Sequence, residues 1–505
     1  MGGSPALSVV EPDSACANHP VRRAVADRKT LVVPLDAKWT DLTRLLQASD
    51  RAPEAADHTA IAVPLSNPQQ EILGVVCLLN RTSAAALPRH LVSFVEALAG
   101  TAAIAIENQI LLREQKALLE SLIKLIAGAI DAKSPHTGAH CQRVPEIATM
   151  LARAACEATD GPFRDFTMND EEWETLHIAA WLHDCGKVTT PEYVVDKATK
   201  LQTIYDRLHE VRMRFEVVKR DAEIDYWKRV VDGGDRATLR AELDSKCKEL
   251  DAEFRFVAEC NQGGEFMAPE KIDRIKRIAR RPWLRTLDNR IGLSHEEQTR
   301  FGAGAAPTLP VFEQLLSDKP EHITEWSEVD LRAAESADPF NLRLPPHKRN
   351  NGEIYNLSIG RGTLNDEERR IINDHVVQTI RMLSQLPFPK HLRNVPAISG
   401  GHHEKLDGTG YPRRLSGKEL SLPARILAIA DIFEALTARD RPYKTSRTLS
   451  QAVALMASMS SARHIDAELF ELFLTSGVYR EYAARFLEPA QIDEVDVAAY
   501  VPTVA

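Results

Sequence analysis

Residues 176–197 read LHIAAWLHDCGKVTTPEYVVDK, and the adjacent pair His183-Asp184 in this stretch is the strongest clue to the architecture. At a helix end, such a pair can supply one nitrogen and one bridging oxygen to neighbouring metal ions. A single histidine, however, is more often a core or surface residue than a ligand. The interpretation therefore depends on further ligands elsewhere in the chain.

Four other segments each add a nitrogen or a carboxylate. They are HTGAHCQRV with His140, NDEERRIINDHV with His375, GGHHEKLDGTGYP with His402 and His403, and ARILAIADIFEALTARDRPYK with Asp431. A mixed histidine and carboxylate set favours iron, manganese, zinc or related ions over calcium or magnesium, which prefer oxygen ligands. Because neighbouring residues diverge by about 100° on a helix, we expect His402 and His403 to bind different ions.

Composition excludes several other classes of protein. The seven cysteines among 505 residues form no CxxC pair, which argues against a disulfide framework and a thiolate zinc site. The net charge of −9 provides no positive field for nucleic acid or an anionic membrane. We interpret the basic run 271–285 as a solvated helix face. With no secretory signal and no apolar run of membrane-spanning length apparent, we expect a cytoplasmic protein.

The N-terminal region has a different pattern. Residues 59–80 predict two apolar strands joined by a polar loop, and 31–35 predict another short strand. The following helical stretch carries Ile104, Leu111, Leu118 and Leu125 at intervals of seven, which predicts a coiled-coil seam between two copies of the chain through residues 94–126. The alternative is an amphipathic helix packed on its own domain.

Two family resemblances follow from these residues. The PL…GVVCLLN strand pair and the AIAIEN helix make residues 19–112 similar to a GAF domain whose opening elements are missing. The segments HxxRV (140–144), HDxGK (183–187), TLNDEERRIINDH (363–375), HHExxDGTGYP (402–412) and ADIFEALTARDRPYK (430–444) resemble an HD-GYP domain over 121–200 and 361–480. This resemblance implies an all-α catalytic domain. Its metal ligands would be His140, His183, Asp184, His375, His402, His403 and Asp431, with Asp184 as the bridge.

The same resemblance assigns further roles. Lys187, Arg441 and Lys444 would meet substrate phosphate, and His183, Asp184 and Lys187 would form the catalytic set. The loop Gly410-Tyr411-Pro412 would contact the substrate and a GGDEF-type partner. His136, four residues before His140, is a candidate ligand of a third ion, the alternative being a plain helix-start histidine. We expect two or three divalent ions, iron or manganese first, with zinc, nickel or cobalt as alternatives.

The implied activity is hydrolysis of cyclic di-GMP to pGpG or GMP in bacterial second-messenger signalling. The alternatives are a 3′,3′-cyclic GMP-AMP phosphodiesterase and a non-catalytic signalling scaffold. The expected fold class is α+β and multidomain. Its parts are a GAF-like unit (1–110), a helical linker (111–131), the two catalytic parts (132–200 and 361–480) and a tail (481–505). An inserted helical subdomain at 201–360 would act as a lid, a dimer contact or a partner platform.

Overall fold

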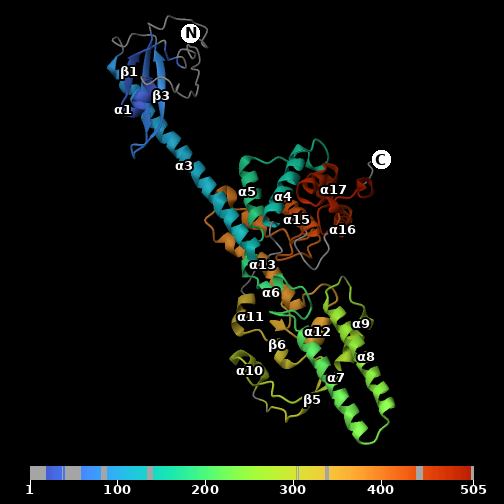
Figure 1. Ribbon diagram of the computed structural model, residues 1–505. Coiled ribbons are helices and arrows are strands. Elements are labelled where there is room, and N and C mark those ends of the chain that lie inside the picture. Colours follow the sequence, from blue (N-terminus) through green and yellow to red (C-terminus); the bar gives the residue numbers. More distant parts are fainter. Residues whose placement is uncertain are drawn as a thin grey trace. The chain divides into compact units, whose positions relative to one another are not determined.

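The computed structural model describes residues 19–36, 38–39, 42, 58–80, 88–133, 140–264, 266–302, 304, 306–335, 340–438 and 447–501. The chain divides into two compact units, residues 1–122 and 123–505 (Figure 1). The first unit is mixed α/β and the second is mainly helical, so the α+β multidomain prediction is confirmed.

The first unit is built on a three-stranded antiparallel sheet in the order β1-β2-β3. Its elements are α1 (Pro20–Asp27), β1 (Leu31–Pro34), β2 (Thr59–Ser66) and β3 (Ile72–Asn80). Alternate residues of β2, among them Ile61 and Val63, pack against Val95 and Ala99 of the helix α3 (Arg89–Lys133). The strands fall where the sequence predicted them.

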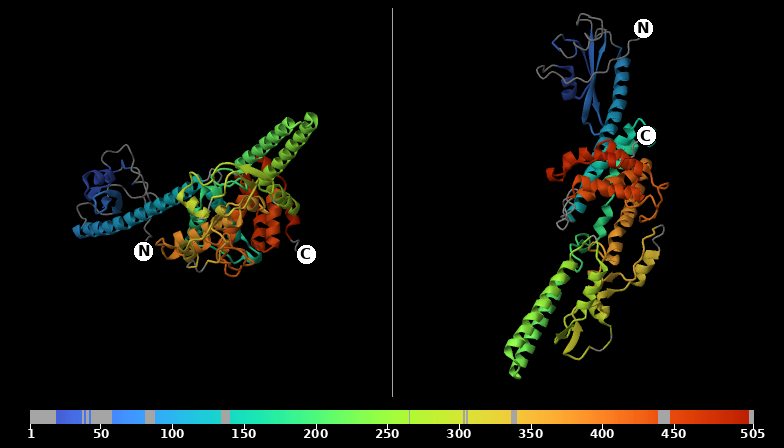
Figure 2. Two further views of the ribbon diagram at one scale, coloured as in Figure 1. Left: turned by 90° about the horizontal axis from the view of Figure 1, so that it is seen from below. Right: turned by 90° about the vertical axis from the view of Figure 1, so that its right-hand side faces the viewer.

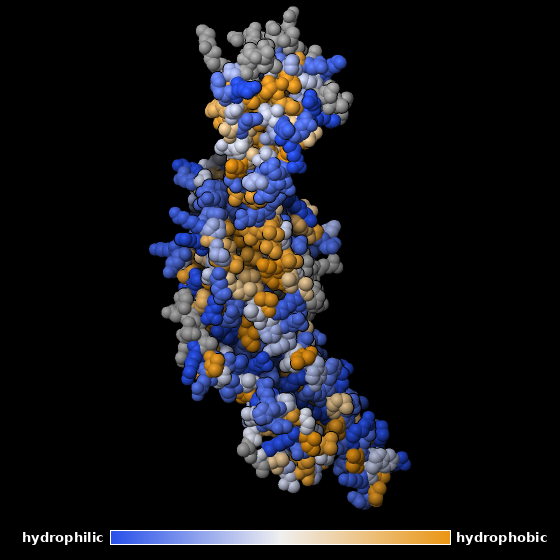
Figure 3. Space-filling view, turned by 90° about the vertical axis from the view of Figure 1, so that its left-hand side faces the viewer, coloured by the Kyte–Doolittle hydropathy of each residue, from blue (hydrophilic) through white to orange (hydrophobic). Residues whose placement is uncertain are grey.

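The helix α3 leaves the sheet with many apolar side chains exposed, and Figure 3 shows hydrophobic surface on the face along which it runs. Leu118 and Leu125, two members of the seven-residue series, are 61% and 68% exposed. The helix also contains an 18-residue window of mean hydropathy 1.4, which by length and composition alone could cross a membrane. The expectation that no apolar run reaches this length was wrong, because small residues between the larger ones raise its hydropathy.

The larger core of the second unit is formed by helices that precede and follow the insertion in the sequence. Its first helices are α4 (His140–Glu157), α5 (Asp170–Leu182), the 3-10 helix η4 (Cys185–Thr189) and α6 (Glu192–Val195). After the insertion follow α13 (Asp366–Ser384), α14 (Val395–Ser399), α15 (Leu422–Thr437), α16 (Leu449–Ser461), α17 (Ala467–Thr475) and α18 (Val478–Phe486). One core joins them, with Ile147 of α4 packed among Phe433, Phe473 and Tyr479. Residues from α18 to Val501 pack on this core and do not form the predicted tail, because their apolar side chains complete it.

The insertion has a core of its own, in which Val211, Leu250 and Leu315 are fully buried. A long hairpin of α7 (Leu208–Val231) and α8 (Arg236–Asn261) dominates it, as Figure 2 shows in green. The other elements are α9 (Pro269–Ala279), β4 (Pro282–Arg285), α10 (His295–Phe301), β5 (Val311–Gln314), β6 (Ile323–Thr324), α11 (Glu328–Glu335), β7 (Arg349–Asn350) and α12 (Glu353–Leu357). Two small antiparallel sheets, β4-β5 and β6-β7, therefore accompany the predicted helices.

Candidate metal centre

His183 and Asp184 lie where α5 ends. The helix begins at a capping box in which Asn169 accepts from the backbone of Glu172 and the Glu172 side chain returns to the backbone of Asn169. Its apolar residues enter the core, which leaves His183 and Asp184 0% and 2% exposed at the other end. A buried carboxylate at this position requires a compensating positive charge or metal ion.

Close packing explains why the HDxGK segment has a glycine at position 186. A Cβ atom there would lie 2.0 Å from the carbonyl oxygen of His375 and 2.5 Å from the backbone nitrogen of Thr379. The Gly186 N–H donates to the Thr379 hydroxyl at 2.9 Å. This close approach of η4 to α13 brings His183-Asp184 beside His375, although nearly 200 residues separate the two segments in the sequence.

Three of the histidines are held in the same way. The Nδ1 atom of His183 lies 2.7 Å from the carbonyl of Ala180, and that of His402 lies 2.5 Å from the carbonyl of Ser399. His375 makes the equivalent contact with the carbonyl of Ile372. Because a carbonyl can only accept, each Nδ1 carries a proton, which leaves Nε2 as the nitrogen that can bind a metal ion when it is unprotonated.

His140 is held differently, by a residue that the sequence analysis missed. Its Nδ1 lies 2.5 Å from one oxygen of Glu434, whose other oxygen accepts from the Arg143 Nε at 2.6 Å. Glu434 is 1% exposed. It follows Asp431 by three residues on α15 and therefore lies on the same helix face, and this spacing could have identified it from the sequence. A carboxylate behind a ligating imidazole orients the ring and raises its basicity.

Asp184 stands between two sets of histidines. Its Oδ2 lies 3.3 Å from the Nε2 atoms of both His140 and His183. Its Oδ1 lies 3.2 Å from His375 Nε2 and 3.9 Å from His402 Nε2. The two oxygens of one carboxylate thus face two different groups of nitrogens.

We define these sets as the His140 group (His140, His183, Asp184 and Asp431) and the His375 group (His375, His402 and His403). The Asp431 Oδ1 lies 3.2 Å from His140 Nε2 and 3.7 Å from His183 Nε2, and the three histidines of the second group present ring nitrogens within 4.8 Å of one another. Among the described residues, the buried Nε2 atoms of His140, His183, His375 and His402 and the Asp184 Oδ1 make no hydrogen bond. Buried polar atoms that make no hydrogen bond and cluster within each group fit divalent metal ions.

The structure places His402 and His403 close together with His375, so the expectation that they bind different ions finds no support in their positions and stays a prediction. They lie in a turn after α14, where the angular spacing of an α-helix does not apply. Their ring centroids are 4.2 Å apart, and both rings contact His375.

The electrostatics of the two groups are opposite. Burial disfavours a charged His183, but Asp184 and Asp431 outweigh burial and raise its pKa to about 9. Burial, together with the neighbouring His183, lowers the pKa of His402 to about 3. Burial would raise the pKa of Asp184, but Lys187 and His183 hold it well below its usual range. At neutral pH without metal, His183 therefore retains a proton that His402 does not.

Only some of the predicted substrate-binding residues are among those that the structure describes. The Lys187 ammonium lies 2.5 Å from Asp184 Oδ2. The Tyr411 ring stacks on His403 with centroids 4.9 Å apart, which brings the loop 410–412 against the His375 group. His136, Arg441 and Lys444 lie outside the described residues, so their predicted roles stay predictions.

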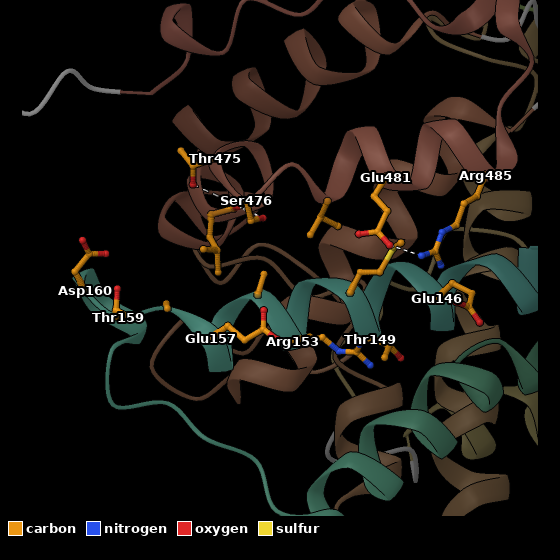
Figure 4. A pocket seen from close by; sticks show the side chains of 15 residues that line it. Glu146, Thr149, Arg153, Glu157, Thr159, Asp160, Thr475, Ser476, Glu481 and Arg485 are labelled. Carbon is orange, nitrogen blue, oxygen red and sulfur yellow. Dashed lines mark hydrogen bonds and ion pairs between the residues drawn. The ribbon is translucent and has the colours of Figure 1, made fainter.

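Two cavities differ in their relation to these groups. A hollow of about 10 Å³, the space of a single water molecule, is lined by Asp131, His140, Asp184 and Lys187. A much larger groove of about 490 Å³ lies between α4 and α17–α18 (Figure 4). It is lined by Arg153, Glu157 and the exposed pair Glu481–Arg485, and by no histidine. The groove is therefore separate from the metal centre.

Family comparisons match both parts of the chain. A family model described as HD domain matches residues 310–469, and one described as GAF domain matches residues 4–106. The HD match includes the His375 group and Asp431 but not His183-Asp184, which precedes the insertion in the sequence.

Several curated proteins are similar to short parts of the chain. The 3′3′-cGAMP-specific phosphodiesterase 1 of Vibrio cholerae is 39% identical over 113 residues, 22% of this chain and 25% of that protein. The 3′3′-cGAMP-specific phosphodiesterase 3 of the same organism is 44% identical over 96 residues, 19% and 20% of the two chains. A cyclic di-GMP phosphodiesterase of Pseudomonas aeruginosa is 34% identical over 135 residues, 26% and 31%. This chain thus spans less than a third of the length of these relatives. Both resemblances are confirmed: a GAF domain model and an HD domain model match the chain, and the similar proteins are named as phosphodiesterases of cyclic dinucleotides.

Proposed function

We propose that this chain is a metal-dependent phosphodiesterase of cyclic dinucleotides, with cyclic di-GMP as substrate. The observation that carries the proposal is the position of Asp184, one oxygen of which faces the nitrogens of the His140 group and the other those of the His375 group. A carboxylate shared in this way is suited to bridging two ions.

We assign one ion to each group, with Asp184 common to both. Iron or manganese suits the mixed nitrogen and oxygen donors. When bound, the ions would acidify a water and stabilise charge on a phosphoryl group. A third ion at His136 is a further part of this proposal.

The protein's own residues would then bind and orient the phosphodiester. Water would add to phosphorus and the bond to the 3′ oxygen would break, which leaves a 5′ phosphate and a 3′ hydroxyl in the linear product pGpG. Lys187 would stabilise the added negative charge, since its pKa is raised: burial lowers it, but Asp184 and Asp431 more than compensate. A second hydrolysis of the same kind would yield GMP.

The second candidate substrate is 3′,3′-cyclic GMP-AMP, because two of the similar proteins are named as phosphodiesterases specific for it. Chromatography of products from the manganese-loaded protein with each cyclic dinucleotide, using Asp184→Ala as control, decides between the two. Binding of either compound without product would support the scaffold alternative and overturn the enzymatic proposal.

We also propose that α3 pairs with α3 of a second copy. The exposed Ile104, Leu111, Leu118 and Leu125 would lie along that seam. Leu118→Glu should convert a dimer to a monomer in light scattering, whereas Lys116→Glu on the same helix should not. A wild-type monomer at micromolar concentration would contradict the pairing. A cytoplasmic location and a GGDEF-type partner at the loop 410–412 remain predictions.

A further inference from the structure

The closing segment of the insertion reaches the loop of Gly410-Tyr411-Pro412. The backbone N–H of Asn341 donates to the carbonyl of Pro412 at 2.6 Å. The ring of Phe340 lies between two guanidinium groups, that of Arg413 at 5.6 Å and that of Arg381 of α13 at 5.8 Å. Cation–π contacts at such distances hold an aromatic ring against its neighbours.

The same loop is tied closely to a residue of the His375 group. Tyr411 stacks on the His403 ring at an interplanar angle of 22°, and its N–H donates to the His403 carbonyl at 3.2 Å. A Cβ atom on Gly410 would lie 2.3 Å from the backbone nitrogen of Lys405, so the loop has no room to move inward. A displacement at Pro412 or Arg413 would therefore be passed to Tyr411 and to the ring of His403.

Buried and half-buried polar contacts attach the insertion region to the start of α13, the helix that carries His375. Lys197, just before the insertion, pairs with both oxygens of Glu368 at 2.7 and 2.8 Å. From within the insertion, the Tyr355 hydroxyl donates to Glu367 at 2.9 Å, and the side chain of Asn365 donates to the carbonyl of Asn350 at 3.0 Å. None of these contacts involves a residue of the His140 group.

We propose that Phe340 and Asn341 are positioning residues for the His375 group, and that the insertion acts as a built-in partner of the loop 410–412. The proposal rests on the proposed function, since it assumes that the His375 group holds a metal ion. Phe340 and Asn341 act through the loop and through α13, because they contact Pro412, Arg413 and Arg381 and not the histidines themselves. Gly410 and Pro412 are already buried in this arrangement, so the loop contacts the insertion where an external partner was expected.

The test is calorimetric titration of the full chain with Mn²⁺. Phe340→Ala should weaken one of two manganese equivalents about five- to tenfold and leave the other unchanged, the loss expected when one cation–π and hydrogen-bonded contact is removed. Phe312→Ala is the matched control, because Phe312 belongs to the same insertion and is 72% exposed. Arg413→Gln removes one of the charges facing Phe340 and should have a smaller effect in the same direction.

A combined variant assigns the effect to the correct ion. In His375→Ala, which should retain one manganese equivalent, adding Phe340→Ala should cause no further weakening. Thermal unfolding of each variant reports whether it folds. Equal weakening of both equivalents, or of neither, in a folded Phe340→Ala would overturn the inference while leaving the proposed function intact. A wild-type chain that binds no manganese and hydrolyses neither cyclic dinucleotide would overturn the proposed function itself.

Discussion

Asp184 lies between the His140 group and the His375 group, but the buried imidazoles of the two groups have different electrostatic surroundings. The His140 group surrounds its imidazoles with carboxylates, and burial is outweighed so that the pKa of His183 is raised to about 9. The His375 group consists of imidazoles alone, and burial lowers the pKa of His402 to about 3. The difference indicates that one ion would compete with protons for its ligands, whereas the other would meet His402 and His403 already unprotonated.

Removing the shared carboxylate should have the largest effect. Asp184→Asn keeps the shape but removes the charge that serves both groups, so we expect at least about a hundredfold loss of phosphodiesterase activity and of manganese affinity. Asp170→Asn, in the first turn of the same helix α5, is the control. If Asp184→Asn still binds two equivalents with wild-type affinity, the carboxylate is not shared.

Gly186→Ala should separate the two groups physically. Its added Cβ would meet the His375 carbonyl, and because that partner is backbone, the overlap should destabilise the fold by about 1–3 kcal/mol. Urea unfolding measures the change. Gly128→Ala is the matched control, because a Cβ there meets nothing within 4 Å. An unchanged free energy of unfolding in Gly186→Ala would contradict the close approach of η4 and α13.

Glu434→Gln should affect the His140 group selectively. The amide cannot replace the carboxylate behind His140, so one manganese equivalent should weaken about ten- to hundredfold while the other stays unchanged. Glu481→Gln, which breaks only an exposed ion pair with Arg485, should leave both equivalents as in the wild type. Weakening of both equivalents by Glu434→Gln would show that the two groups are not independent.

A change of pH should have the smallest effect of these perturbations, and it should distinguish the manganese affinities of the two groups. A raised pKa means that His183 is protonated at neutral pH, so binding of an ion must release that proton and its affinity should rise about tenfold per pH unit up to about pH 9. Burial lowers the pKa of His402 to about 3 and holds that of His403 well below its usual range, so the affinity of the ion at the His375 group should depend less on pH. Manganese titrations between about pH 6 and pH 8 check this. Parallel slopes for both equivalents would remove the distinction.

The sequence predicted the residues of the metal centre better than their grouping. Spaced segments carrying His140, His183-Asp184, His375, His402-His403 and Asp431 are the ones that the fold brings together. The pairing of His402 with His403 in one group could not be predicted, because it depends on a turn whose conformation neighbouring residues do not specify. Glu434 was missed for a similar reason: the contact with His140 spans 294 positions in the chain.

The contacts of the insertion were also not predictable from the sequence. The sequence predicts its bounds, 201–360, and its helical character. Neither prediction contains information on which residues the insertion contacts. The contacts of Phe340 and Asn341 with Arg413 and Pro412 depend on tertiary packing, so they appear only once the chain is folded.

The contacts between the two ends of the insertion affect how the polypeptide folds. Leu201 and Leu357 lie in one core, and the Lys200 ammonium donates to the carbonyls of Leu357 and Ile359 at 3.1 and 2.9 Å. The packing of the insertion thus holds its two ends close together. Once the insertion has folded, the helices before and after it are joined as if by a short loop. Because the entropy lost in closing a loop grows with its length, folding of the insertion before the flanking helices would reduce the entropy cost of bringing those helices together.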